Sequence, residues 1–169
     1  DRRSFIAGTV GAGLAAAVQP AGAMTISTPT QGLSAGTVTI ASGGFAMPVY
    51  RALPAGGSGL PVVLVVSEIF GVHAHIADVA RRLAHRGYLA IAPELFARHG
   101  DAKSYTEIPK LFEEVVAKAP DAQVLSDLDA CVAWAGANGG DLTRLGVTGF
   151  CWGGRITWLY AAHSRAVKA

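Results

Sequence analysis

The sequence predicts an α/β fold in which a mainly parallel sheet is flanked by helices. Apolar segments of strand length alternate with segments of helical periodicity along most of the chain. Residues 61–67 form an apolar, largely β-branched run, as expected for a strand that helices cover on both faces. Residues 145–160 read as a strand, a Gly-rich turn and a helix in direct succession.

Composition limits the possible functions. The chain has 169 residues, which suggests one domain, and 51% of them are hydrophobic, enough to build a core. The 14 Lys and Arg nearly balance the 12 Asp and Glu, and no basic run stands out, so nucleic-acid binding is unsupported. The spacing of Cys131 and Cys151 fits neither a C-x-x-C metal pair nor a disulfide framework. Cys131 lies on the apolar side of a predicted helix, where we expect it in the core.

Residues 1–23 resemble an export signal. Arg2 and Arg3, followed by Ser-Phe-Ile, resemble the twin-arginine motif, although Asp1 stands where that signal prefers Ser or Thr. A Gly- and Ala-rich apolar segment over 6–18 precedes Ala-Gly-Ala, which suits a peptidase site. A bilayer span needs about 20 residues, more than this segment has. We therefore expect the twin-arginine machinery to export a periplasmic protein; the alternative is an ordinary flexible N-terminus.

The remaining chain divides into a linker and one domain. Residues 24–36, rich in Ser, Thr, Pro and Gly, predict a linker, and the domain is expected over 37–169. Strands are predicted over 38–40, 45–52, 61–67 and 88–92, and helices over 78–86, 108–118 and 121–137. A long polar loop separates residues 93 and 106. Residues 166–169 resemble the start of another strand, so we expect a portion of a longer protein.

Cys151 stands at the centre of the most informative motif. Gly149-Phe-Cys-Trp-Gly153 has the pattern of a G-x-S-x-G nucleophile elbow with Cys in place of Ser. The glycines are needed because the nucleophile has a strained backbone and side chains beside it would collide. The N-terminus of the following helix would stabilise a thiolate. The alternative is a small buried Cys beside a Gly turn.

Two charged residues are expected at the same edge of the sheet. Glu68 follows the strand 61–67, and Arg98 lies in the loop after the strand 88–92. Open α/β sheets build their sites at the carboxyl ends of parallel strands. Each residue has a structural alternative: Glu68 as the ion-pair partner of an Arg, and Arg98 as an ordinary solvated loop residue.

Three motifs together resemble the dienelactone hydrolase family, also called carboxymethylenebutenolidases. They are Ser-Glu-Ile-Phe-Gly-Val over 67–72, Pro-Glu-Leu-Phe-Ala-Arg over 93–98 and Gly-Phe-Cys-Trp-Gly-Gly over 149–154. The resemblance covers residues 37–169 and implies an α/β-hydrolase fold that continues beyond the elbow helix. It implies the following roles: Cys151 as nucleophile, Glu68 as the acid that controls the charge of the thiol, Ile69 and Trp152 as backbone donors of the oxyanion hole, and Arg98 as the ligand of a substrate carboxylate. Glu94 departs from the Asp usual in the family, which puts the shape of its loop in doubt.

The resemblance implies hydrolysis of a small, carboxylate-bearing lactone or ester without a metal or organic cofactor. The chemistry is consistent, because a thiolate attacks esters, N–H groups stabilise the oxyanion, and a guanidinium pairs with a carboxylate. The alternative is a noncatalytic binding or thiol redox-sensing protein on a hydrolase scaffold.

The base that such a hydrolase needs is not assigned. In α/β-hydrolases an Asp and a His follow the nucleophile in chain order. His163 is the sole His after Cys151, at the end of the elbow helix, and His73 and His75 could at most line the pocket. We therefore expect the catalytic His and Asp beyond Ala169, and this chain alone to be inactive or nearly so.

Overall fold

The computed structural model describes residues 26–169, so the predicted signal over 1–23 lies outside the described residues. The strands are β1 (Leu33–Ser42), β2 (Phe45–Pro54), β3 (Leu60–Val66), β4 (Leu89–Pro93) and β5 (Gly140–Gly149). The helices are α2 (Ala74–His85), α3 (Ile108–Glu114), α4 (Asp121–Ala137) and α5 (Trp152–His163), with short 3₁₀ turns η1 (Ala102–Ser104) and η2 (Val116–Lys118). None of these helices is long and apolar enough to cross a bilayer.

The strands form one sheet in the order β1-β2-β4-β3-β5. β1 and β2 are antiparallel, as are β2 and β4, whereas β3 runs parallel to both β4 and β5. The sheet is therefore mixed, and its parallel part comprises the three strands that the sequence places around the candidate site. Since β4 and β5 lie on opposite sides of β3, the strand order reverses there, at the position where open α/β sheets bind ligands.

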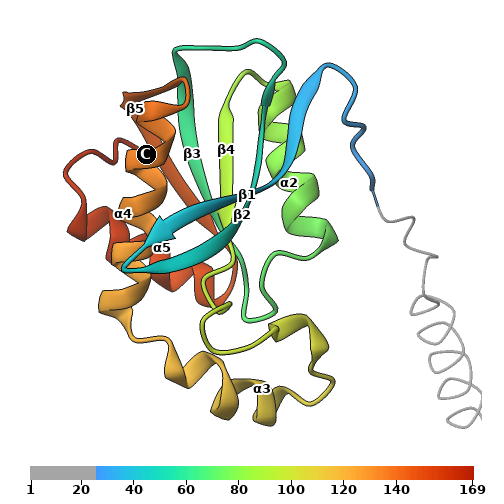
Figure 1. The fold of residues 1–169 in the computed structure, drawn as a ribbon, viewed down its shortest axis with the longest axis vertical. Coiled ribbons are helices and arrows are strands. Elements are labelled where there is room, and N and C mark those ends of the chain that lie inside the picture. Colours follow the sequence, from blue (N-terminus) through green and yellow to red (C-terminus); the bar gives the residue numbers. More distant parts are fainter. Residues whose placement is uncertain (1–25) are drawn as a thin grey trace, which may run out of the picture.

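Helices cover both faces of the sheet, with α2 on one side and α4 and α5 on the other (Figure 1). Successive side chains of β3 point to opposite faces of the sheet. Val62, Leu64 and Val66 belong to the core under α4 and α5. Val65 belongs to the core under α2. This two-sided burial is what the apolar run predicts.

Several elements are longer than expected. β1 begins at Leu33, inside the segment predicted as a linker, because it pairs with β2 along its whole length. β5 begins at Gly140, five residues before the predicted start at Leu145, because Gly140 and Asp141 pair with the start of β3. Pairing partners distant in sequence decide both boundaries.

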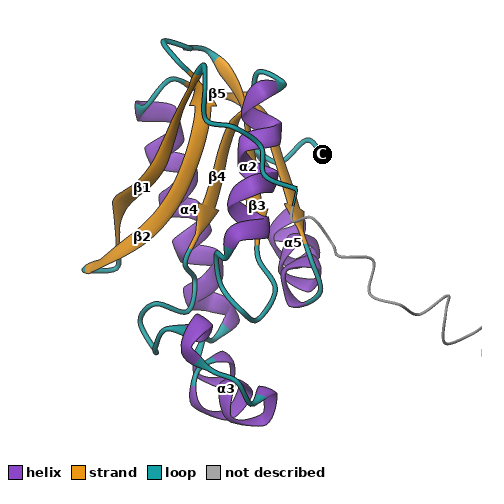
Figure 2. Cartoon of the chain, turned by 90° about the vertical axis from the view of Figure 1, so that its right-hand side faces the viewer, coloured by secondary structure: helices purple, strands orange, loops and turns teal. Residues whose placement is uncertain are grey.

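The last residues, which in the sequence resemble the start of another strand, run beside β5. A parallel bridge joins Leu145 to Val167. The Lys168 N–H donates to the Leu145 carbonyl at 2.8 Å, and the Val147 N–H donates to the Ala169 carbonyl at 2.9 Å. The loop after β4 leads to α3, which lies beyond the carboxyl end of that strand (Figures 1 and 2).

Candidate active site

Cys151 occupies the sharp turn between β5 and α5. Its backbone has φ 52° and ψ −116°, and within residues 26–169 it is the one residue other than glycine with a positive φ. Its side chain is exposed and forms no disulfide. This is the strained conformation predicted for a nucleophile elbow, and the exposure removes the alternative of a buried Cys.

The glycines on either side are required by close backbone contacts. A Cβ at Gly149 would lie 2.2 Å from the carbonyl oxygen of Gly153. A Cβ at Gly153 would lie 2.4 Å from the carbonyl oxygens of both Val66 and Ser67. The start of α5 therefore packs directly against the end of β3.

The residues adjacent to the thiol are anchored to two other elements. The Phe150 N–H donates to the Val66 carbonyl at 3.2 Å, and its ring meets His75 of α2 edge-on at 5.8 Å. The ring of Trp152 packs on the buried Phe96 of the loop after β4, with 4.7 Å between ring centroids. These contacts restrict the position of the turn from both faces of the sheet.

The two backbone donors expected in the oxyanion hole have no acceptor within the described part of the chain. The N–H groups of Ile69 and Trp152 donate no hydrogen bond to residues 26–169. Trp152 is the first residue of α5, where N–H groups lack partners in the helix itself. Unpaired donors at this point are available to bind an anion.

Glu68 lies after β3 and pairs with a histidine. Its Oε2 is 2.9 Å from Nε2 of His73, and both side chains are partly buried. Nδ1 of His73 accepts the N–H of His75 at 3.4 Å, so Nε2 is the ring nitrogen that faces Glu68. Glu68 therefore has no Arg partner in residues 26–169, and no hydrogen bond joins it to Cys151 there.

Arg98 is held within the protein. Its Nη2 donates to Oδ1 of the buried Asp127 at 2.6 Å and to the carbonyl of Ser42 at 2.7 Å, and its Cζ lies 4.5 Å from the ring centre of Phe45. Only 18% of the side chain is exposed, so the alternative of a solvated loop residue is wrong. Its buried Nε has no partner among residues 26–169. No hydrogen bond brings Arg98 to Cys151 or Glu68.

Cys131 and His163 lie where the sequence suggests. Cys131 is fully buried in the core, where burial and the nearby charge of Asp127 raise the pKa of its thiol. His163 ends α5, and its Nε2 lies 2.8 Å from Oδ2 of Asp129 in α4. This pairing ties the two helices together and leaves His163 away from the thiol side of α5.

The roles of two supporting residues, Asp127 and Glu94, escaped the sequence reasoning, although Glu94 stood out as a departure from the family pattern. Asp127 holds Arg98 from α4, and Glu94 accepts the N–H of Val72 in the loop that carries Glu68. An acid on the apolar side of a predicted helix was the available signal for Asp127. The hydrogen bond between Glu94, after β4, and Val72, in the loop after β3, had no signal in the sequence.

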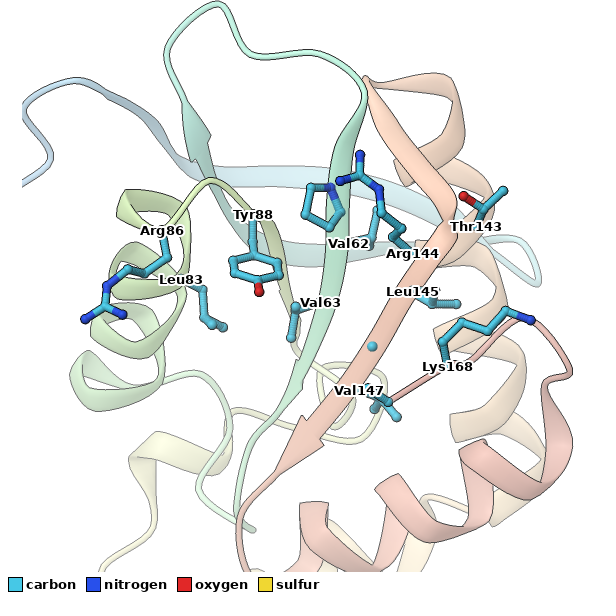
Figure 3. A pocket seen from close by; sticks show the side chains of 13 residues that line it. Val62, Val63, Leu83, Arg86, Tyr88, Thr143, Arg144, Leu145, Val147 and Lys168 are labelled. Carbon is cyan, nitrogen blue, oxygen red and sulfur yellow. The ribbon is translucent and has the colours of Figure 1, made fainter.

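No cluster of three or more potential metal ligands occurs in residues 26–169. A hollow of about 910 Å³ lies between α2 and residues 168–169 on one face of the sheet (Figure 3). Its lining is mainly apolar, with Arg86, Arg144 and Lys168 among the polar residues. None of the candidate site residues lines it.

Comparison with known proteins places these features in a family. The sequence model of the dienelactone hydrolase family matches residues 47–169. A protein of Methylorubrum extorquens, provisionally named a carboxymethylenebutenolidase, is 59% identical over 171 residues, which cover 100% of this chain and 59% of that protein. A carboxymethylenebutenolidase of Pseudomonas sp. is 33% identical over 145 residues, covering 81% of this chain and 57% of that protein.

Solved structures agree. The crystal structure of a provisionally named dienelactone hydrolase from Klebsiella pneumoniae is 60% identical, with a TM-score of 0.77, over 80% of this chain and 57% of that one. A dienelactone hydrolase-like promiscuous phosphotriesterase from metagenomic libraries is 26% identical, with a TM-score of 0.65, over 81% and 57% of the two chains. The predicted α/β-hydrolase fold is thus confirmed. The chain spans less than two thirds of the length of these relatives.

Proposed function

The chain belongs to the dienelactone hydrolase family, and from this we propose that its protein hydrolyses a small lactone or carboxylic ester that bears a carboxylate, with Cys151 as nucleophile. The observation that supports the proposal best is the strained, exposed Cys151 at the strand-to-helix turn. Backbone strain at one non-glycine residue persists only where the surrounding structure enforces it, which is typical of active sites.

The proposed reaction has two steps. The Cys151 thiolate attacks the carbonyl carbon, and the oxyanion that forms accepts hydrogen bonds from the N–H groups of Ile69 and Trp152. The carbon–oxygen bond of the ester then breaks, an acyl-thioester remains, and the departing alkoxide takes up one proton from water and leaves as the alcohol. A second water adds its OH to the acyl carbon, the carbon–sulfur bond breaks, and the products are the carboxylic acid, the restored thiolate and one proton, which replaces the proton taken up in the first step.

Glu68 completes the set of catalytic groups that we propose within this chain. We propose that Glu68 controls the charge of the thiol before substrate binds; its partial burial beside the elbow loop, with His73 as its partner, supports a specific position for the carboxylate. Within the described residues no histidine is hydrogen-bonded to Cys151, and we assign no general base to this chain.

We further propose that Arg98 binds the substrate carboxylate. Asp127 and Ser42 engage only its Nη2, and the buried Nε lacks a partner in residues 26–169. A guanidinium oriented by one carboxylate can still donate to a second through its remaining N–H groups.

The nucleophile is tested with the full-length protein and an activated ester such as p-nitrophenyl acetate. Cys151→Ala should lower kcat by roughly 1,000-fold or more, because removing a nucleophile leaves only binding and oxyanion stabilisation. Cys131→Ala is the matched control and should retain kcat, since Cys131 lies in the core. Undiminished turnover in Cys151→Ala would contradict the proposal, and a wild-type protein without turnover would favour the binding or redox-sensing alternative.

Export through the twin-arginine machinery is a separate proposal, supported by Arg2, Arg3 and the apolar segment that follows them. Replacing both arginines with Lys should retain the precursor in the cytoplasm, as measured by cell fractionation and immunoblotting. Normal periplasmic recovery of the Lys variant would argue against this route.

A further inference from the structure

The loop over residues 67–72 carries both Glu68 and Ile69, yet most of its hydrogen bonds are local. The Ser67 hydroxyl donates to the Glu68 carbonyl at 3.0 Å, and the His73 N–H donates to the Gly71 carbonyl at 3.0 Å. These bonds shape the loop but do not fix it relative to the neighbouring strands. A loop that presents an oxyanion donor needs such fixing, because small displacements of a catalytic group are costly.

Glu94 supplies the one hydrogen bond within residues 26–169 that ties this loop to a distant part of the chain. Its Oε2 accepts the N–H of Val72 at 3.1 Å. Glu94 directly follows β4, and its own N–H donates to the Pro48 carbonyl of β2 at 3.0 Å. The carboxylate therefore connects the loop after β3 to the rigid edge of the sheet.

Gly71 provides the space for this contact. It has a φ of 72°, and a Cβ there would lie 2.7 Å from Oε2 of Glu94. The carboxylate thus packs against a bare Cα, close to the Val72 N–H that it accepts. Glycine is needed here both for the left-handed backbone and for the approach of the side chain.

The second oxygen of Glu94 has its own partner. Oε1 pairs with Nζ of Lys103 in η1, and 18% of the Glu94 side chain is exposed. Burial lowers the pKa of Lys103, but the hydrogen bond and charge of Glu94 outweigh burial and raise this pKa above its ordinary value. Oε2 therefore binds the Val72 N–H and Oε1 binds Lys103, so the two partners do not compete for the same oxygen.

We propose that Glu94 is a positioning residue: by holding Val72 it fixes the loop that directs the Ile69 N–H toward the oxyanion and Glu68 toward the thiol. This role rests on the proposed function, because it acts through the oxyanion donor. The length of the side chain is essential to it. Asp at this position would keep the charge but would fall short of the Val72 N–H by about one carbon–carbon bond length, roughly 1.5 Å.

The experiment measures kcat and KM for p-nitrophenyl acetate in the full-length protein. Glu94→Ala and Glu94→Asp should lower kcat by about tenfold or more with KM within about twofold, because a displaced oxyanion donor acts in the transition state. Glu94→Gln should retain kcat within about threefold, since its amide oxygen can still accept the Val72 N–H. A trifluoromethyl ketone, which forms an oxyanion on the thiol, should lose affinity in parallel with kcat.

Lys103→Met is the matched control. It removes the ion pair but leaves the Val72 hydrogen bond, so kcat should stay within about twofold of wild type. A Glu94→Asp variant with wild-type kcat, or a Lys103→Met variant as impaired as Glu94→Ala, would overturn the inference. Cys151→Ala, measured in the same assay, separates the two failures: undiminished activity there contradicts the proposed function, whereas lost activity there with unaffected Glu94 variants contradicts only the role of Glu94.

Discussion

A Cβ at Gly153 would lie 2.4 Å from the carbonyl oxygen of Ser67. The first turn of α5 and the end of β3 are therefore in backbone contact, one residue before Glu68 and two residues after Cys151. This contact brings the proposed nucleophile and the loop with the proposed acid to one point, although 83 residues, the difference between positions 151 and 68, separate them in the sequence.

Gly153→Ala should destabilise the protein because its methyl group has no room between two backbone carbonyls. Overpacking of this kind costs about 1–3 kcal/mol. Gly154→Ala is the matched control: its Cβ would meet the Gly149 carbonyl at an ordinary 3.6 Å. Since Ala is favoured over Gly within helices by about 1 kcal/mol, Gly154→Ala should be neutral or stabilising. Thermal unfolding checks both, and equal stability of the two variants would contradict the close contact.

Arg98→Ala should raise KM by about tenfold or more for a monoester of a dicarboxylic acid, whose second carboxyl group is a free carboxylate. The reason is that a charged hydrogen bond contributes about 1.5–3 kcal/mol. KM for a neutral ester of similar size should change little. Steady-state kinetics with both substrates make the comparison. An equal effect on the two would show that Arg98 does not bind the carboxylate.

The effect of Arg98→Ala on substrate binding must be separated from its effect on stability, because this change also leaves the buried Asp127 unpaired. The single change should cost about 3 kcal/mol. Pairing Arg98→Met with Asp127→Asn removes both charges and should recover much of that stability in chemical denaturation. The double variant should nevertheless keep the raised KM for the anionic ester.

Native alkylation should distinguish the two cysteines. Iodoacetamide should modify Cys151, which is exposed, and leave Cys131, whose burial and neighbouring Asp127 raise its thiol pKa. Peptide mapping by mass spectrometry would measure both sites, and both should react after denaturation. Modification of native Cys131 at the same rate as Cys151 would contradict the packing of α4.

Asp78 should make stability depend on pH. It is buried in α2, where burial raises its pKa, but hydrogen bonds from Thr28 and Arg82 and the Arg82 charge outweigh burial and lower that pKa below its ordinary 3.8. The folded state therefore binds this proton less readily than the unfolded state. The stabilisation is present above pH 3.8 and is lost as the pH falls through the folded-state pKa.

Asp78→Asn should accordingly lower the free energy of unfolding by roughly 2–4 kcal/mol at pH 7, because Arg81 and Arg82 lose their shared partner. The difference from wild type should shrink below pH 4. Denaturation at both pH values measures this. Glu107→Gln, which breaks an exposed pair with Lys110, is the control and should cost less than about 1 kcal/mol. If the difference in unfolding free energy between wild type and Asp78→Asn did not change with pH, Asp78 would be excluded as the source of the pH dependence.

Most helices and strands could be predicted from the sequence because the patterns that specify them lie within each segment. The apolar run of β3, the helical periodicity of α4 and the glycines of the elbow each express a constraint within a few residues. The early starts of β1 and β5 had no such signal, because pairing with β2 and β3 extends them. Strand ends depend on partners that a linear reading does not identify.

The sequence by itself determined the α/β class, the strained turn at Cys151 and the need for Gly149 and Gly153, since backbone sterics act between near neighbours. Only the tertiary structure decided the partners of the charged residues: His73 for Glu68, Asp127 for Arg98 and Val72 for Glu94. Strand order and helix packing bring these groups within hydrogen-bond distance, and no spacing along the chain encodes those distances.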